Sequence, residues 1–321
     1  MKFNGFIAAL LFSILVAWFL PEGPEVLPLK TITDIGIGFI FFFYGLKLSP
    51  AEFKAGFYNY RVHIIIQLTT FVLFPMLTLT FAPFFDTGTA SDLWLALFFL
   101  GALPSTVSSS IVMVSLARGN LPTAIFNASL SGLIGIVATP LWMSLFMAAS
   151  SDFEFGAVVQ KLVIQIILPL IIGLFLQKFL GDLARKHSKK ISFFDKTIII
   201  LIVYSSFSSA FSSQLFTTVG PVDLLKLLII VTILFFAVYF GLGLISRLMN
   251  LGVEDEIAAK FCGTKKSLVH GSVMVKVIFG NSAANALFLL PIMLYHILQL
   301  LVIAVFAESY RKRAARENHI Q

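Results

Sequence analysis

The residues best suited to chemistry lie in two polar interruptions of long hydrophobic segments. The first is Pro104-Ser105-Thr106-Val107-Ser108-Ser109-Ser110, in the middle of the apolar stretch 92–118. Proline removes a backbone donor and clashes with the preceding helical turn, and closely spaced hydroxyls compete for the carbonyls that a helix needs. At bilayer depth such a segment is tolerated where protein buries it or where it lines a wet cavity. The pattern therefore predicts a broken membrane helix at a binding site.

The second interruption is Thr264-Lys265-Lys266-Ser267, inside the apolar segment 254–279. A lysine near the membrane midplane costs at least about 2.5–3.5 kcal/mol, and neighbouring helical residues project about 100° apart. The two ammonium groups must therefore face a cavity, a set of carbonyls or the first interruption. The alternative is that the span starts later and that the pair lies at its cytoplasmic mouth. Burial disfavours a charged lysine, so a lysine that titrates during transport is a further alternative.

The two interruptions occupy corresponding places in the two halves of the chain. Val112-Met113-Val114 and Gly119-Asn120 recur 161 residues later as Val273-Met274-Val275 and Gly280-Asn281, in a chain of 321 residues. Interrupted spans at matching positions of two halves are the best sequence indicator of a transporter's binding site. The sequence thus predicts an internal repeat.

The composition indicates an all-α membrane protein. Hydrophobic residues make up 58% of the chain and charged residues only 12%, whereas soluble domains carry about 25% charge. The net charge of +7 is gathered in a few loops, as in membrane proteins generally, so no nucleic-acid partner is expected. The single cysteine, Cys262, excludes an internal disulfide framework and a zinc cluster.

Ten apolar segments have about the length needed to cross roughly 30 Å of hydrocarbon. They are 3–20, 29–48, 62–84, 92–116, 122–149, 155–179, 192–213, 222–248, 254–279 and 283–306. A signal peptide is the competing interpretation of the first, but no small-x-small cleavage pattern follows it. Residues 1–150 and 151–321 then hold five spans each, and the odd number makes the repeat inverted.

The charged loops predict that both termini are cytoplasmic. One side of the predicted membrane carries the basic residues Lys47, Lys54, Arg61, Arg118, Lys178, Arg185, Lys186, Lys189, Lys190, Lys196, Arg311, Lys312, Arg313 and Arg316. The other side carries the acidic residues Glu22, Glu25, Asp86, Asp92, Asp152 and Glu154. Such a bias is typical of proteins of the inner cell membrane, although a basic tail can also bind anionic lipid headgroups.

Other polar residues can complete a site around the interruptions. Hydroxyls and unwound carbonyls are ligands that Na⁺ accepts in transporters, while serine and threonine also pack between membrane helices. We expect Na⁺ to be held by Ser108, Ser109, Ser110, Thr123 and Asn127. We expect Ser105, Thr106, Thr264, Lys265, Lys266 and Ser267 to bind substrate or to substitute for a bound charge. Coupling candidates are His270, Gln67 and Thr70; His270 is placed toward the outer end of its span, and His296 and Gln299 are interpreted as packing residues.

Two segments resemble the bile acid/sodium symporter superfamily. Leu116-Ala117-Arg118-Gly119-Asn120, after a small polar run, is similar to the end of that family's fourth helix. Phe261-Cys262-Gly263-Thr264-Lys265-Lys266-Ser267 resembles a divergent SBF-like branch, which in vertebrates includes the seventh member of solute carrier family 10. The resemblance implies ten helices in a core domain and a panel domain, with discontinuous, crossing helices four and nine. It also implies alternating access by movement between the two domains.

The family's sodium ligands transfer incompletely to this sequence. Anchored on Arg118, the motif serine falls on Ser110, but its neighbouring asparagine falls on Ile111. The fifth-helix hydroxyl ligands fall on Ala124 and Ala128, one position from Thr123 and Asn127, and the third-helix glutamine falls near Thr70. In the ninth helix the sodium-binding glutamate aligns with Phe261 and a nearby glutamine with Lys265. A lysine repels a cation within about 4–6 Å, so we expect Lys265 or Lys266 to occupy the second sodium position.

These observations predict a secondary transporter of a small organic anion, coupled to at most one Na⁺. The alternatives are a sodium-independent carrier that uses protons or lysine, and a non-transporting regulator with the same fold. An enzyme is not expected, because the sequence has no pair of intramembrane carboxylates, no metal-ligand spacing and no Ser/His/Asp set. No cofactor is expected beyond Na⁺, and monomer and homodimer both stay open.

Overall fold

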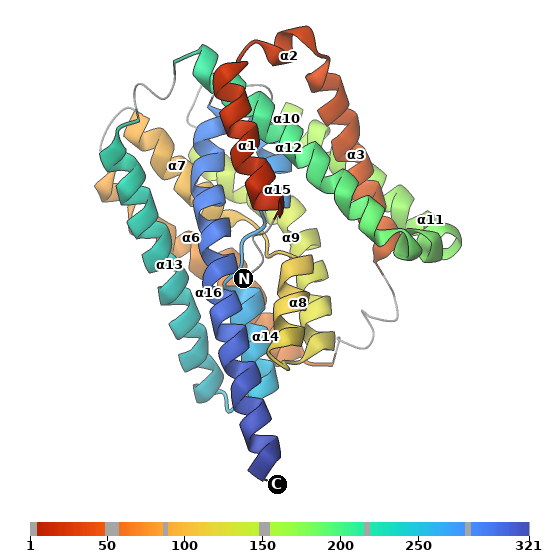
Figure 1. The fold of residues 1–321 in the computed structure, drawn as a ribbon, viewed down its shortest axis with the longest axis vertical. Helices are drawn as coiled ribbons and strands as arrows, with labels where there is room; N and C mark the ends of the chain where they lie inside the picture. Colours follow the sequence, from red (N-terminus) through yellow and green to blue (C-terminus); the bar gives the residue numbers. More distant parts are fainter. Residues whose placement is uncertain are drawn as a thin grey trace.

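The structure is a computed structural model, which describes residues 5–48, 58–85, 89–147, 155–214, 219–279 and 284–320. These residues form helices joined by short connections, without a strand in the ranges given (Figure 1). The first half contains α1 (Gly5–Phe19), α2 (Gly23–Val26), α3 (Leu29–Lys47), α5 (Tyr60–Leu68), η1 (Thr69–Leu73), α6 (Phe74–Leu79), η2 (Ala82–Phe84), α7 (Thr89–Ala102), α8 (Ser108–Leu116) and α9 (Leu121–Met147).

The second half contains α10 (Phe155–Leu162), η3 (Val163–Ile167), α11 (Leu168–Lys186), α12 (Ser188–Ser212), α13 (Pro221–Leu248), α14 (Val253–Gly263), α15 (Leu268–Phe279) and α16 (Asn285–Ile320). Most predicted segments agree with these helices to within a few residues. The sixth and the tenth are wrong at their ends, because these helices continue to Lys186 and Ile320. Gly280-Asn281, Lys54, Asp86, Asp152 and Glu154, used above, lie outside the described residues.

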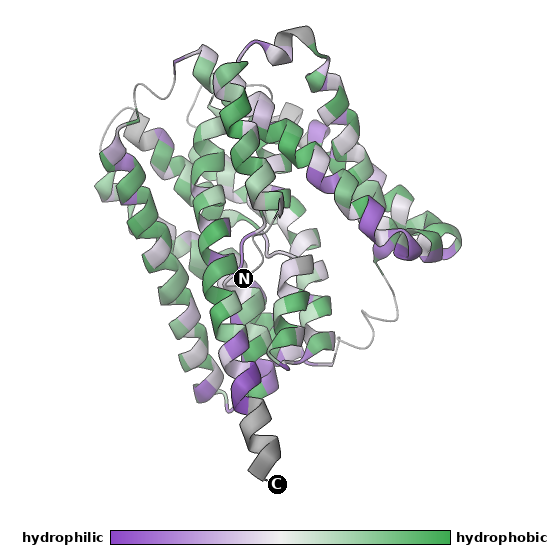
Figure 2. Cartoon of the chain, viewed as in Figure 1, coloured by the Kyte–Doolittle hydropathy of each residue, from purple (hydrophilic) through white to green (hydrophobic). Residues whose placement is uncertain are grey.

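Several helices can cross a membrane by length and composition. Among the described residues seven qualify, and shorter apolar helices cover Ala8–Phe19 and Asp92–Ala102. Each of these seven helices has 19 to 29 residues, which at 1.5 Å per residue is about the 30 Å thickness of the hydrocarbon core or more. The chain is therefore an integral membrane protein. Figure 2 shows apolar residues along the outer helix faces, with hydrophilic residues concentrated toward helix ends.

Both predicted interruptions are observed. The helix that starts at Thr89 stops at Ala102, and α8 begins only at Ser108. The helix that starts at Val253 stops at Gly263, and α15 begins at Leu268. Figure 1 shows the two non-helical segments together in the middle of the molecule, between α7 and α8 and between α14 and α15.

The remaining helices pack in two groups around this centre. In one, α3 packs against α11 and α12, and α1 packs against α12. At the α3–α11 crossing a Cβ on Gly45 would lie 2.4 Å from the carbonyl oxygen of Leu170, and one on Gly173 would lie 2.2 Å from that of Phe42. The two backbones therefore approach at small residues, as is common between membrane helices. In the other group α5 to α9 pack with α13, α14 and α16.

Candidate functional site

The two interruptions contact each other directly. The backbone N–H of Ser267 donates to the carbonyl of Pro104 (2.9 Å), and the hydroxyl of Ser105 donates to the carbonyl of Cys262 (2.6 Å). The last carbonyls of a helix have no intrahelical partner, and none can be left bare inside a membrane. Each broken helix therefore supplies donors to the end of the other, which fixes their relative position.

Lys266 binds three backbone carbonyls from two other segments. Its fully buried ammonium donates to the carbonyls of Thr70 (2.9 Å), Gly101 (2.6 Å) and Leu103 (2.8 Å). The ring of Phe74 lies beneath it, with its centroid 4.1 Å from Nζ. An ammonium has three N–H donors, so this carbonyl cage, formed by Thr70, Gly101 and Leu103, satisfies all of them.

The carbonyls of the cage are available because of local helix breaks. η1 is a π-helical turn in which Phe74 N–H donates to the carbonyl of Thr69, so the next carbonyl, that of Thr70, would need a donor at Pro75. Proline has no N–H, and Lys266 supplies the donor instead. The indole of Trp142 donates to the nearby carbonyl of Phe71 (2.8 Å), whose α-helical donor would also be at Pro75. Gly101 and Leu103 lie at the end of α7, where carbonyls lack helical partners.

The backbone of Lys266 is held from α16. The side-chain oxygen of Gln299 accepts from the N–H of Lys266 (2.8 Å), and its amide donates to the carbonyl of Lys266 (2.9 Å). The hydroxyl of Tyr295 donates to the carbonyl of Thr264 (2.5 Å). Both side chains are fully buried. Gln299, interpreted above as a packing residue, has a structural role, and it replaces the backbone partners that the second interruption lost.

Lys265 has a different environment from its neighbour. Its ammonium is also fully buried, but both of the hydrogen bonds that it makes to described residues go to Ser109, at 2.7 Å to the carbonyl and 3.4 Å to the hydroxyl. At least one of its three N–H donors is therefore left for another acceptor. Its ammonium therefore lies at the first turn of α8. The N-terminus of a helix carries partial positive charge and so favours an anion nearby.

One face of α9 supports the first interruption. Ser131, Gly135 and Thr139 are spaced four residues apart, so they lie on one helix face. The hydroxyl of Ser131 accepts from the N–H of Ser105 (2.9 Å), and Thr139 donates to the carbonyl of Ala102 (2.8 Å). A Cβ at Gly135 would lie 2.6 Å from the ring of Pro104. Glycine at this position lets the broken segment lie against the helix.

The hydroxyls of the first interruption form a small cluster. Thr106 Oγ1 shares hydrogen bonds with Ser109 Oγ (2.8 Å) and Ser110 Oγ (3.0 Å). Ser110 also donates to the carbonyl of Phe261 (3.5 Å). Ser109 connects this cluster to Lys265, because the ammonium of Lys265 bonds both its carbonyl and its hydroxyl. The side chain of Ser108, a predicted sodium ligand, lies outside the described residues.

The other predicted sodium ligands belong to a second cluster. Asn127 bonds His63 Nδ1 (2.7 Å) and the carbonyl of Thr123 (3.0 Å), and its oxygen accepts from Gln67 (3.1 Å). The hydroxyl of Thr123 accepts from Asn59 (3.2 Å). Among the described side chains, no hydrogen bond joins this cluster to the cluster of Thr106, Ser109 and Ser110. The predicted sodium ligands thus belong to two hydrogen-bonded clusters.

Three further predicted residues act through backbone atoms or caps. Thr70 meets Lys266 with its carbonyl, while its hydroxyl bonds Ile66 of its own helix (2.8 Å). Thr264 likewise donates to the carbonyl of Lys260 (2.6 Å). Ser267 caps α15, because its hydroxyl accepts from the N–H of His270 (3.2 Å).

The predicted position of His270 is wrong. The residue is 6% exposed and lies in the first turn of α15, where its Nδ1 shares a hydrogen bond with Ser267 Oγ (2.9 Å). Its ring also meets those of Phe41 and Tyr44. His270 therefore lies beside the interruption, because α15 starts at Leu268, and not toward the outer end of the span.

Comparison with known proteins matches nearly the whole chain. Residues 4–312 match the SBF-like CPA transporter family. An uncharacterized protein of Pseudomonas aeruginosa is 36% identical over 97% of this chain and 93% of its own. The "Putative symporter YfeH" of Escherichia coli is 33% identical over 96% of this chain and 93% of its own. Sodium/bile acid cotransporter 7 of Xenopus tropicalis is 30% identical over 90% of this chain and 85% of its own.

Proposed function

The chain belongs to the SBF-like CPA transporter family, and from that premise we propose that it carries a small organic anion by alternating access. Its relatives carry transporter and symporter names, which is a non-enzymatic class. The chain is therefore a membrane transporter of the bile acid/sodium symporter type. The single observation that carries the finer proposal is the buried meeting point of two broken helices, with Lys265 beside the start of α8.

Charge at this meeting point favours an anionic cargo. The first turns of α8 and α15 direct partial positive charge toward the interruptions, and Lys265 has an N–H to offer. Broken helices in transporters point their N-termini at anionic substrate groups in this way. A carboxylate or sulfonate that replaces the contact of Lys265 with Ser109 would receive a charge-assisted hydrogen bond. Ser105 and Thr106 line the same interruption.

Lys266 fills the place of a bound cation in this proposal. A ring of backbone carbonyls is the environment that Na⁺ accepts in broken transporter helices, and the carbonyl cage holds an ammonium there instead. A fixed charge makes one ion unnecessary and repels another within about 4–6 Å. At most one Na⁺ is then cotransported. Ser108, Ser109 and Ser110 would hold it only after the ammonium of Lys265, which bonds Ser109 here, has moved away, and Thr123 and Asn127 are the second candidate location.

The proposed arrangement in the membrane counts each interrupted pair of helices as one crossing. It gives ten crossings in two inverted repeats, residues 1–150 and 151–321. The group of α1 to α3 and α10 to α12 would form the panel domain and the remaining helices the core domain. The basic residues then place both termini in the cytoplasm, by the positive-inside rule. Monomer and homodimer are both compatible with this arrangement.

The proposal is tested with purified protein. A thermal-shift screen of carboxylates and sulfonates, with NaCl or choline chloride, identifies a ligand and its sodium dependence. Uptake of that ligand into proteoliposomes should saturate and show counterflow, which a carrier produces. A ligand that stabilises the protein but is never transported would instead support a regulator that kept the fold.

The sodium-independent alternative uses one lysine as the coupling group. The observation that favours it is the incomplete hydrogen bonding of Lys265, since a buried ammonium with few partners is costly to keep charged. Uptake insensitive to Na⁺, dependent on a pH gradient and lost in Lys265→Gln would support this alternative over sodium coupling.

A further inference from the structure

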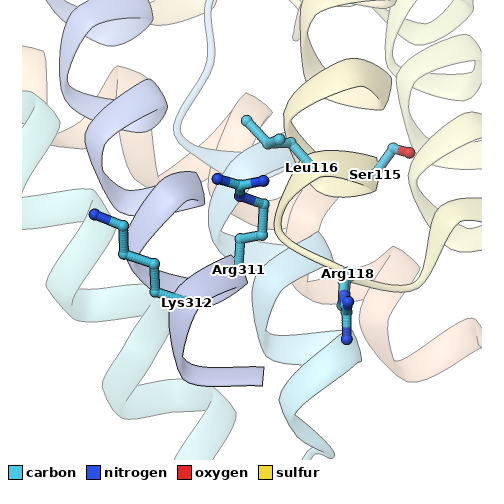
Figure 3. A pocket seen from close by; sticks show the side chains of 5 residues that line it. All are labelled: Ser115, Leu116, Arg118, Arg311 and Lys312. Carbon is cyan, nitrogen blue, oxygen red and sulfur yellow. The ribbon is translucent and has the colours of Figure 1, made fainter. Parts of the chain in front are cut away.

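A basic pocket lies at the far end of α8 from the interruption. Its volume is about 560 Å³, and it is lined by Ser115, Leu116, Arg118, Arg311 and Lys312. Arg118 is nine residues along the chain from Ser109, so the pocket is roughly 13 Å from the candidate site at 1.5 Å per helical residue. Figure 3 shows the guanidinium of Arg311 between α8 and α16, with Arg118 and Lys312 on either side of it.

The charge of the pocket is positive. Glu308 neutralises part of it, because its carboxylate accepts from Arg311 at 2.8 and 2.7 Å and lies 3.9 Å from Lys312. The residues that line the pocket include three cations and no carboxylate. Besides Glu308, the acidic start of α14 lies near it, because Asn120 bonds the backbone of Glu254 and the carboxylate of Asp255. Arginine pairs well with phosphate because its planar donors match the oxygen geometry.

Arg118 occupies a backbone position that usually takes glycine. Its φ is 59°, and α8 ends in a Schellman motif: Gly119 N–H bonds the carbonyl of Val114 (2.9 Å) and Arg118 N–H that of Ser115 (3.2 Å). Glycine is preferred here because left-handed backbone is unfavourable for a residue with a Cβ. An arginine in this position is strained, which points to a role for its side chain.

Exposed apolar side chains lie on both helices that border the pocket, where an acyl chain could pack. Val112 and Leu116 are 60% and 39% exposed and lie one turn apart on α8. On α16, Leu301 and Val305 are 45% and 62% exposed, and Lys312 follows Val305 by two turns on the same stripe. α8 and α16 contact each other. Arg311 and Lys312 stand at the end of the apolar segment Asn285–Arg313, where a membrane surface is expected.

We propose that this pocket binds the phosphate of an anionic phospholipid, with Arg118, Arg311 and Lys312 on the headgroup and the acyl chain along α8 and α16. Basic pockets between membrane helices bind anionic headgroups in this way. The site does not depend on the transported substrate. Lipid bound there would tie the end of α8 to α16, two elements that meet at one end of the core.

The test titrates the full-length protein in detergent with phosphatidylglycerol, phosphatidylcholine or inorganic phosphate, and follows binding by native mass spectrometry. Phosphatidylglycerol should bind more tightly than phosphatidylcholine. Arg118→Gly and Arg311→Gln should each weaken phosphatidylglycerol binding about fivefold, the contribution of one basic residue near an anionic membrane. Arg118→Gly should keep its melting temperature without lipid, since glycine accepts the left-handed backbone.

The matched control is Arg185→Gln. Arg185 is also exposed and forms an ion pair with a carboxylate three residues earlier, Asp182, at 2.6 Å, so its loss should leave lipid binding unchanged. Equal binding of the two lipids, or equal loss in all three variants, would overturn the proposal. Inorganic phosphate that binds as tightly as phosphatidylglycerol would show that the pocket serves a soluble anion, which also contradicts a lipid site.

Discussion

Lys265 and Lys266 are neighbours in sequence, are equally buried, and differ in almost every contact. Lys266 donates to three carbonyls and lies over the ring of Phe74. Within the part of the chain that the structure describes, Lys265 bonds only to Ser109. Removing one partner from a satisfied buried polar cluster costs far more than removing a weakly bonded group. The comparison teaches that one ammonium is part of the scaffold and that the other is available to a ligand.

The largest expected effect is that of Lys266→Met. Methionine fills a similar volume but leaves the carbonyls of Thr70, Gly101 and Leu103 without a donor. Each unpaired buried acceptor costs about 1–3 kcal/mol, so we expect a loss of about 3 kcal/mol or more in unfolding free energy. The measurement is thermal unfolding of detergent-purified protein. Lys265→Met is the matched control, and equal destabilisation by the two variants would break the comparison.

Gln299→Leu should have an intermediate effect. The substitution leaves the N–H and carbonyl of Lys266 unpaired, which is expected to cost about 1–3 kcal/mol. The same unfolding assay measures it. Exposed Lys226→Gln is the control, because its ion pair with Asp223 is on the surface. If Gln299→Leu has the same unfolding free energy as the control, the hydrogen bonds from Gln299 do not stabilise the backbone at Lys266.

Lys265→Gln should have the smallest effect on stability and a large effect on transport. Glutamine keeps a donor for Ser109, so the unfolding free energy should change by about 1 kcal/mol or less. Uptake of the ligand found by thermal shift should fall at least about tenfold, because a charge-assisted hydrogen bond is lost. Unchanged uptake in proteoliposomes would remove Lys265 from the substrate site.

Part of this contrast follows from the sequence and part does not. Pro104 and the two adjacent lysines are sufficient to predict both interruptions, and lysines so deep in a membrane need carbonyls or a broken helix. Which lysine binds the carbonyls depends on the π-helical turn before Pro75. The sequence shows that Pro75 lacks an N–H, but it does not show which side chain bonds the carbonyl left without a donor. Gln299 is 33 residues from Lys266, so only the packing of α16 reveals their pairing. His270 was misplaced because the start of α15 was unknown.

The central claim is that the ammonium of Lys266 replaces one bound cation. The most direct test is the dependence of ligand uptake into proteoliposomes on Na⁺ concentration, with choline as the replacement ion. The account predicts a Hill coefficient for Na⁺ no greater than about 1, because the carbonyl cage is already filled by the side chain. A coefficient near 2, from two cooperative sodium ions, would contradict it.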